Sequence, residues 1–167
     1  MIKVLHVGQT EKSGGKYSTA RVLHGALPYL GVASYLAVVE LDNGAHHYGT
    51  VNIFHENIQE KFNLDHVSDA FKNLLASVDI VHLHTTADLV VGMLFRLFIG
   101  MQIQPKVVWS IHDASAYTGG CYFSAVCEKW QNGCLDCPLV ADNENLAKQK
   151  SEVVKLKQAT YSKLAFI

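Results

Sequence analysis

Short apolar runs alternate with amphipathic stretches along this chain of 167 residues. The first run, KVLHVG, is rich in branched side chains and lacks strict apolar–polar alternation, which is typical of a strand buried on both faces of a parallel sheet. Four further runs have a strand-like composition. The five predicted strands cover residues 3–8, 33–39, 51–54, 79–84 and 106–111.

Apolar residues recur at helical spacing in other stretches of the chain. The predicted helices cover residues 17–30, 58–75, 87–102 and 145–162, and a sixth strand is expected from residue 163. In the first helix, Pro28 should distort the last turn and Gly31 should end it. The order of these elements predicts an α/β fold with a Rossmann-like, doubly wound, mostly parallel sheet and right-handed crossovers.

The length favours one domain, which we assign to residues 1–167, with a long cysteine-rich loop at residues 112–139. We find no internal repeat and no low-complexity linker. Because the sequence stops where a sixth strand would begin, we expect it to be the first part of a longer protein.

The composition supports a globular domain and gives no sign of nucleic-acid binding. Apolar residues make up 49% of the chain and charged residues 17%, while a net charge of -1 argues against nucleic-acid binding. The most apolar segment, residues 89–101, contains Arg96 and is too short to span a bilayer. The opening MIKVLHVG lacks the pattern of a signal peptide. We therefore expect a cytoplasmic location, where cysteines stay reduced unless they hold a metal or do redox chemistry.

Ligands of open parallel sheets bind outside the carboxyl ends of the strands. The turn after the first strand, GQTEKSGG, ends in Gly14 and Gly15 and is followed by Lys16. Its backbone N–H groups could approach a phosphate at the start of the next helix. The alternative is a plain turn that needs glycine for its conformation. The glycines do not follow the GxGxxG register, which argues against a dinucleotide site.

Histidines stand in or directly after three of the predicted strands. His112, followed by Asp113, could exchange a proton or stabilise negative charge while the carboxylate orients the loop or ring; the alternative is local hydrogen bonding to the loop. His82 and His84 share one face of their strand. We interpret these two and His6 as packed, hydrogen-bonded residues rather than metal ligands, but we assign His84 to the substrate-binding edge because it is close to the end of its strand.

All four cysteines lie in the long loop, with the spacing C-x5-C-x6-C-x2-C. They are Cys121, Cys127, Cys134 and Cys137. Four thiolates can close a tetrahedral shell around a structural zinc ion, and C-x2-C is a common half of such a site. Two disulfides or free thiols remain the alternatives.

The segments SGG, DIVHLHT, VVWSIHD and TGGCYFSAVCEKWQNGCLDCPL together resemble the N-terminal domain of a family 4 glycosyltransferase. The resemblance covers almost the whole chain, and the HD–TGGC–C–GC–CP segment is its specific part. It is most similar to bacterial enzymes that build capsular, exopolysaccharide or lipopolysaccharide chains.

This resemblance implies one half of a GT-B fold, in which two Rossmann-like domains enclose the active site. It implies a nucleotide-sugar donor, a saccharide or lipid-linked saccharide acceptor, retention at the sugar carbon and no catalytic metal. Carried over by position, Gly14 and Gly15 lie against the donor phosphates, and His112 lies near the transferred sugar, followed by Asp113.

The C-terminal donor-binding domain that the resemblance implies is missing from this sequence, so we expect the chain alone to be inactive. Peripheral contact with the inner face of the membrane stays open. Two other classes were weighed. One is a non-catalytic, zinc-stabilised α/β binding module, and the other is a nucleotide-dependent reductase, for which the glycine pattern is poor.

Overall fold

The structure is a computed structural model that describes residues 1–10, 16–40, 50–53, 64–84 and 88–162. Its chain forms two compact units. We call Met1–Ser110 the sheet unit and Ile111–Leu164 the loop unit. Each is described by itself.

The sheet unit is built on five parallel strands in the order β3-β2-β1-β4-β5. The strands are β1 (Lys3–Thr10), β2 (Ala33–Glu40), β3 (Thr50–Asn52), β4 (Ile80–Leu83) and β5 (Lys106–Trp109). All five were predicted, with small differences at their ends. The sixth predicted strand lies outside the described residues. The sequence order of the strands reverses direction between β1 and β4, which makes their carboxyl ends the topological switch point of the sheet.

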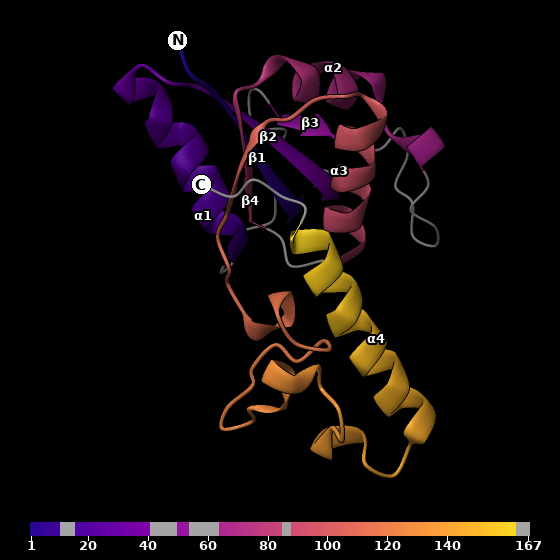
Figure 1. The fold of residues 1–167 in the computed structure, drawn as a ribbon. Coiled ribbons are helices and arrows are strands. Elements are labelled where there is room, and N and C mark those ends of the chain that lie inside the picture. The colour runs from indigo at the N-terminus through magenta and orange to yellow at the C-terminus, as the bar shows by residue number, and fades with distance from the viewer. Residues whose placement is uncertain (11–15, 41–49, 54–63, 85–87, 163–167) are drawn as a thin grey trace. The chain divides into compact units, whose positions relative to one another are not determined.

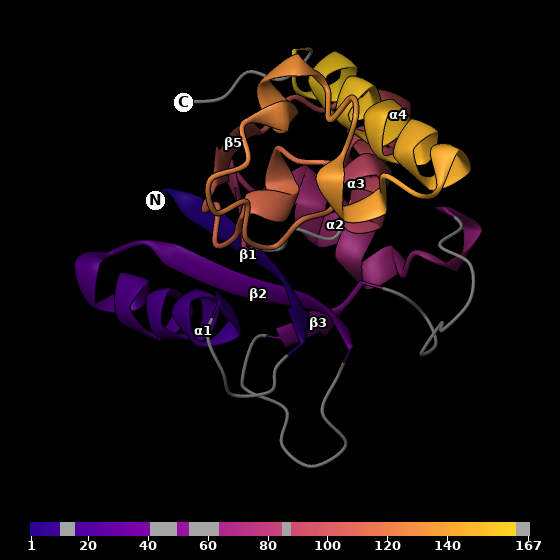
Figure 2. The same cartoon turned by 90° about the horizontal axis from the view of Figure 1, so that it is seen from below.

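Helices cover both faces of this sheet, as the doubly wound prediction requires. Helix α1 (Lys16–Ala26) lies on one face, and α2 (Asp69–Ser77) and α3 (Asp88–Gly100) lie on the other (Figure 2). Leu5 and Val7 on one face of β1 are fully buried, and so is His6 on the opposite face. The first strand is therefore covered on both sides, as its continuous apolar run indicated.

The end of the first predicted helix follows its sequence signals. Residues 27–30 form a 3₁₀ turn that contains Pro28. Gly31 then adopts a left-handed conformation with φ of 75° and donates its backbone N–H to the carbonyl of Pro28. The expected distortion and the glycine stop are both confirmed.

The predicted helix over residues 58–75 is correct from Asp69 onwards and wrong at residues 64–68. The chain forms a short 3₁₀ turn, Leu64–His66, and the helix α2 starts only at Asp69. Ser68 is extended, accepts a hydrogen bond from the N–H of Phe71 at 3.2 Å and donates its own N–H to Ile53. A serine N-cap therefore starts a new helix where the apolar spacing suggested a continuous one. Residues 58–63 lie outside the described part of the chain.

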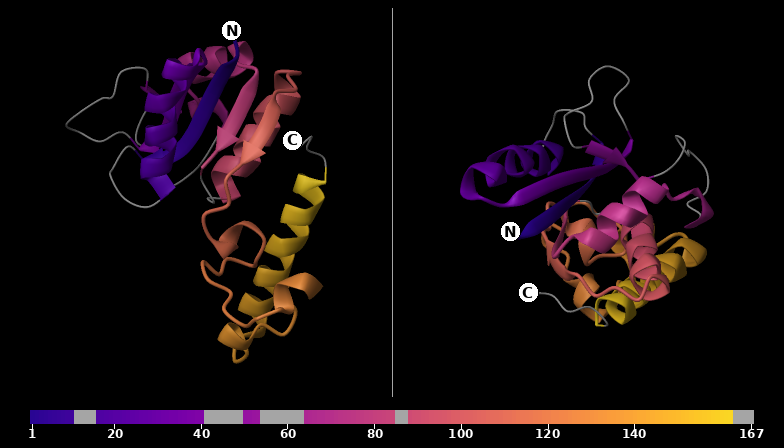
Figure 3. Two further views of the ribbon diagram at one scale, coloured as in Figure 1. Left: turned by 90° about the vertical axis from the view of Figure 1, so that its left-hand side faces the viewer. Right: turned by 90° about the horizontal axis from the view of Figure 1, so that it is seen from above.

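The loop unit contains short turns and one long helix. Three 3₁₀ turns, Ala114–Ala116, Lys129–Asn132 and Pro138–Val140, precede α4 (Glu144–Tyr161). Figure 3 shows the loop running beside this helix. The helix matches the predicted range within one residue at each end. No described helix of either unit has the length and apolar character needed to cross a bilayer.

Candidate functional site

Three histidine rings meet on one face of the sheet unit. His6 on β1 pairs in register with His82 on β4, and His84 follows two positions later, so all three side chains share a face. The ring centroids lie 5.2 Å apart for His6 and His82, 5.3 Å for His6 and His84, and 3.9 Å for His82 and His84. We call this group the histidine trio.

Hydrogen bonds orient the trio, which confirms that these histidines are packed and bonded. Nδ1 of His6 lies 3.1 Å from Nε2 of His84, and Nε2 of His82 lies 2.8 Å from the hydroxyl of Ser110. Burial, with smaller contributions from the charges of His82 and His24, lowers the pKa of His6 from 6.5 to about 3. His6 is therefore neutral at physiological pH.

The trio lies beside the switch point of the sheet. The N–H of His84 donates to the carbonyl of Val7, so His84 continues the β1–β4 ladder by one residue beyond β4. This is the edge where parallel sheets bind ligands. The structure thus places His84, which we assigned to the substrate-binding edge, directly after the end of its strand.

The glycine turn of the same edge lies outside the described residues. Gly14 and Gly15 precede the first described residue of α1, which is Lys16, and the side chain of Lys16 is also not described. Their assignment to a donor phosphate stays a prediction, as does the expected proximity of this turn to His112.

His112 and Asp113 open the loop unit. The His112 side chain is exposed. The carboxylate of Asp113 accepts hydrogen bonds from the N–H of Ser115 at 2.9 Å and from the Ser115 hydroxyl at 2.5 Å. It thereby caps the first 3₁₀ turn of the unit. This geometry gives Asp113 a part in shaping the loop that carries His112.

The Thr-Gly-Gly turn that follows is fixed by close packing. A Cβ added at Gly119 would lie 2.8 Å from the carbonyl oxygen of Lys150, so only glycine fits against α4 there. Gly120 has a φ of 111°, which side chains rarely adopt. The hydroxyl of Thr118 accepts the N–H of Cys121 and donates to its carbonyl. These glycines have a packing role that the sequence analysis did not assign to them.

A buried lysine ties this turn to the long helix. Lys157 is only 5% exposed, and its ammonium group donates to the carbonyls of Ser115 at 2.6 Å and Thr118 at 2.9 Å. The hydroxyl of Tyr161 donates to the carbonyl of Ala116 at 2.9 Å. Lys157 was not among the residues predicted to be functional. Its spacing from the buried Val154 on one helix face could have indicated it.

The four cysteines of the loop unit carry free thiols. Burial, then the negative charges of Cys137 and Cys134, raise the pKa of the Cys121 thiol; Cys127 adds to this and Lys150 opposes it. The thiols are therefore close enough to interact electrostatically.

The terminal C-x2-C pair lies in a turn that places the sulfur of Cys134 within hydrogen-bond distance of the backbone N–H of Gly119. Cys134 and Asp136 both have positive φ angles, 56° and 53°, which fold the pair into a tight turn. The N–H of Gly119 donates to the sulfur of Cys134 at 3.2 Å. This backbone N–H group would also stabilise a thiolate at the same position.

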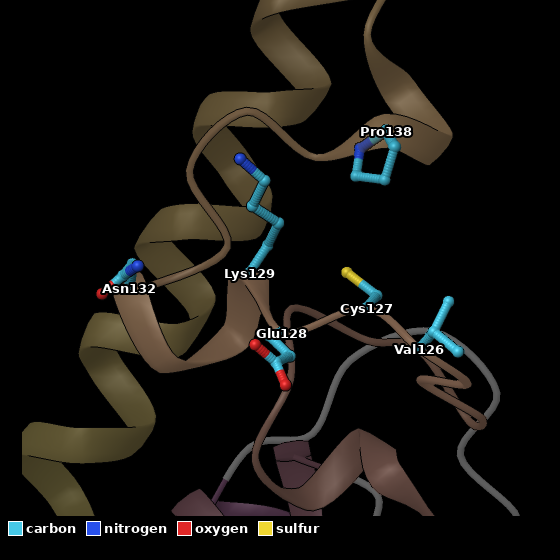
Figure 4. Close-up of a pocket in the computed structure, with 6 residues that line it drawn as sticks. All are labelled: Val126, Cys127, Glu128, Lys129, Asn132 and Pro138. Atoms are coloured by element: carbon cyan, nitrogen blue, oxygen red, sulfur yellow. The ribbon is translucent and has the colours of Figure 1, made fainter.

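A shallow hollow of about 480 Å³ borders the cysteine loop. Its lining residues are Val126, Cys127, Glu128, Lys129, Asn132 and Pro138 (Figure 4). The thiol of Cys127 points into it on the side of Pro138, which directly follows Cys137. The hollow is open and is lined by residues of the loop unit, and we do not assign it a substrate.

Among the described residues, the histidine trio is the one group of three potential metal ligands whose atoms all lie within 4.8 Å of one another.

Comparison with known proteins gives one short similarity. Over 32 residues, the chain is 47% identical to a protein of Escherichia coli (strain K12) that is named as a colanic acid biosynthesis glycosyl transferase, WcaC. This stretch covers 19% of the chain and 8% of the relative. No family model matches the chain. No solved structure matches it either.

Proposed function

We propose that this chain is the acceptor-side, N-terminal half of a family 4, GT-B glycosyltransferase. The whole enzyme would move a sugar, with retention, from a nucleotide-sugar to a growing cell-surface polysaccharide or a lipid-linked acceptor. The similarity to a glycosyl transferase of colanic acid biosynthesis carries this proposal. The parallel sheet supports it, because its switch point offers an edge for a ligand.

In this proposal the two halves of the site have different tasks. Gly14, Gly15 and Lys16 hold the donor phosphates through backbone N–H groups and a positive charge. His84, directly after β4, contacts the substrate at the same edge. The chemistry uses no catalytic metal, so positioned hydrogen-bond donors have to stabilise the charge that develops as the glycosidic bond breaks.

His112 is the residue we propose for that stabilisation. Its exposed imidazole can donate a hydrogen bond to a hydroxyl of the donor sugar. Asp113 is a positioning residue, because its carboxylate already accepts two hydrogen bonds from Ser115 and holds the turn behind His112. A donor-binding domain beyond this chain would complete the site, and this chain alone would be inactive.

The test uses a longer chain that includes the donor-binding half. His112→Ala should lower the turnover number about 100-fold or more, as loss of one preorganised contact typically does. His66→Ala, an exposed histidine of the sheet unit, is the matched control and should leave turnover unchanged. Near-normal turnover of His112→Ala would remove His112 from the mechanism. Sugar transfer by residues 1–167 alone would contradict the two-domain proposal.

We also propose that Cys121, Cys127, Cys134 and Cys137 bind one structural zinc ion. Their electrostatic coupling and the N–H···S hydrogen bond to Cys134 support this proposal. A closed shell of four thiolates leaves no open position for a substrate, so the ion would order the loop and take no part in sugar transfer.

A further inference from the structure

The histidine trio has the ligand chemistry of a metal site, and the proposed sugar transfer uses only one of its members, His84. His6, His82 and His84 each offer one ring nitrogen, and these three atoms lie within 4.8 Å of one another. Nitrogen ligands around a tetrahedral zinc ion lie about 3.3 Å apart, given Zn–N bonds of about 2.0–2.1 Å. The 3.1 Å between Nδ1 of His6 and Nε2 of His84 is close to that spacing.

Hydrogen bonding alone does not satisfy the trio. His6 is fully buried, and its Nε2 has no hydrogen-bond partner among the described residues. Buried polar atoms are usually paired, so an unpaired ring nitrogen on a member of a ligand cluster points to a further binding partner. No acidic side chain is bonded to His6 in the described part of the chain. Imidazole binds a metal in its neutral form.

A second residue orients one of the rings. The hydroxyl of Ser110 lies 2.8 Å from Nε2 of His82. Histidines that bind metals almost always donate their other ring N–H to such a partner, which fixes the tautomer and the ring orientation. With Nε2–H directed at Ser110, Nδ1 of His82 would carry the lone pair.

We propose that His6, His82 and His84 bind one zinc-type divalent cation between β1 and β4. Imidazole suits zinc, and three protein ligands leave one coordination position for water or a ligand oxygen. The ion would join the two strands that flank the switch point, because His6 comes from β1 and the other two come from β4 and the residue that follows it. This site is separate from the cysteine loop and does not rest on sugar transfer.

The first experiment counts zinc ions. The chain with Cys134→Ser and Cys137→Ser, which removes the loop thiolates, is saturated with zinc, freed of excess and analysed for metal. We expect this chain to bind about one zinc ion. The His82→Gln variant should lose that ion, and the control variant His66→Gln should keep it. His82 is only half-buried, so glutamine should be tolerated there. Equal zinc contents in the two variants would overturn the proposal.

The second experiment uses the natural side chains and so holds even if a variant does not fold. Zinc is titrated into metal-free protein while the ring nitrogens of its histidines are followed by ¹H–¹⁵N NMR. Three rings should shift together as one zinc ion binds in addition to the ion that we assign to the cysteines, and Ser110→Ala should weaken this binding about 10- to 100-fold. Ring signals that stay unchanged at zinc saturation would show a purely hydrogen-bonded cluster and refute the site. Neither outcome depends on whether the chain belongs to a glycosyltransferase.

Discussion

The sheet unit and the loop unit are held together in different ways. In the sheet unit, the five strands form four parallel pairs. Large aliphatic and aromatic side chains of this unit, such as Leu5 and Phe71, are completely buried. In the described part of the loop unit there is no strand, and the buried side chains are mostly small or polar. Its turns are fixed by side chains that bond to backbone groups, as Lys157 does.

This difference shows how much each unit can rely on apolar burial. Ordering a residue costs about 1–2 kcal/mol of backbone entropy, which a large buried side chain can offset and an alanine cannot. The loop unit buries Ala114, Ala116, Cys134, Cys137 and Val154 as its apolar residues. It therefore depends on specific polar contacts and, in our proposal, on a metal ion.

The largest effect is expected from breaking the cysteine site. Cys134→Ser keeps an acceptor for the N–H of Gly119 but removes a thiolate, so the loop unit should lose its zinc and its order. Structural zinc contributes on the order of 10 kcal/mol in small zinc domains. The sheet unit should keep its structure.

The two tryptophans of the chain report on the two units separately. Trp109 lies in β5, and Trp130 lies in the second 3₁₀ turn of the loop unit, where its ring is 4.8 Å from that of Tyr117. In a Trp109→Phe background, Cys134→Ser should change the fluorescence of Trp130. In a Trp130→Phe background, it should leave the fluorescence of Trp109 unchanged. A metal-free protein with an ordered, reduced loop would refute the zinc proposal.

A cavity in the sheet unit should have the next largest effect. Leu5→Ala removes a fully buried side chain and should lower the free energy of unfolding by about 2–5 kcal/mol. Leu30→Ala, at a position 77% exposed, is the matched control and should change it by no more than about 0.5 kcal/mol. Urea unfolding followed by Trp109 fluorescence measures both. Equal losses in the two variants would mean that burial does not decide the stability of this unit.

Removing the buried ammonium group should have the smallest effect of the three. Lys157→Met keeps the apolar stem but leaves the carbonyls of Ser115 and Thr118 without this donor, at a cost of about 1–3 kcal/mol. Lys155→Met, on the exposed side of the same helix, should cost little. Urea unfolding followed by Trp130 fluorescence compares them. Similar values for both variants would show that the Lys157 hydrogen bonds do not hold the loop to the helix.

Much of the sheet unit could be predicted from local sequence patterns. The branched apolar run at the N-terminus identified β1 as a strand covered on both faces, and Pro28 with Gly31 identified the end of the first helix. These signals are local, because they depend on the conformational preferences of a few neighbouring residues. The same kind of signal failed at Ser68, where an N-cap interrupts apolar spacing that looked continuous.

The residues of the candidate sites likewise fall into those that the sequence indicated and those that only the structure brought together. The sequence by itself identified the parallel α/β class, the cysteine cluster, the position of His112 after its strand and that of His84 near the end of its own. Each of these follows from composition or from spacing along the chain. Only the tertiary structure decided that His6 meets His82 and His84, and that Lys157 reaches Ser115. The pairing of β1 with β4 brings together His6 and His84, which are 78 positions apart in the chain. It is set by how whole strands pack, which no short stretch of sequence contains.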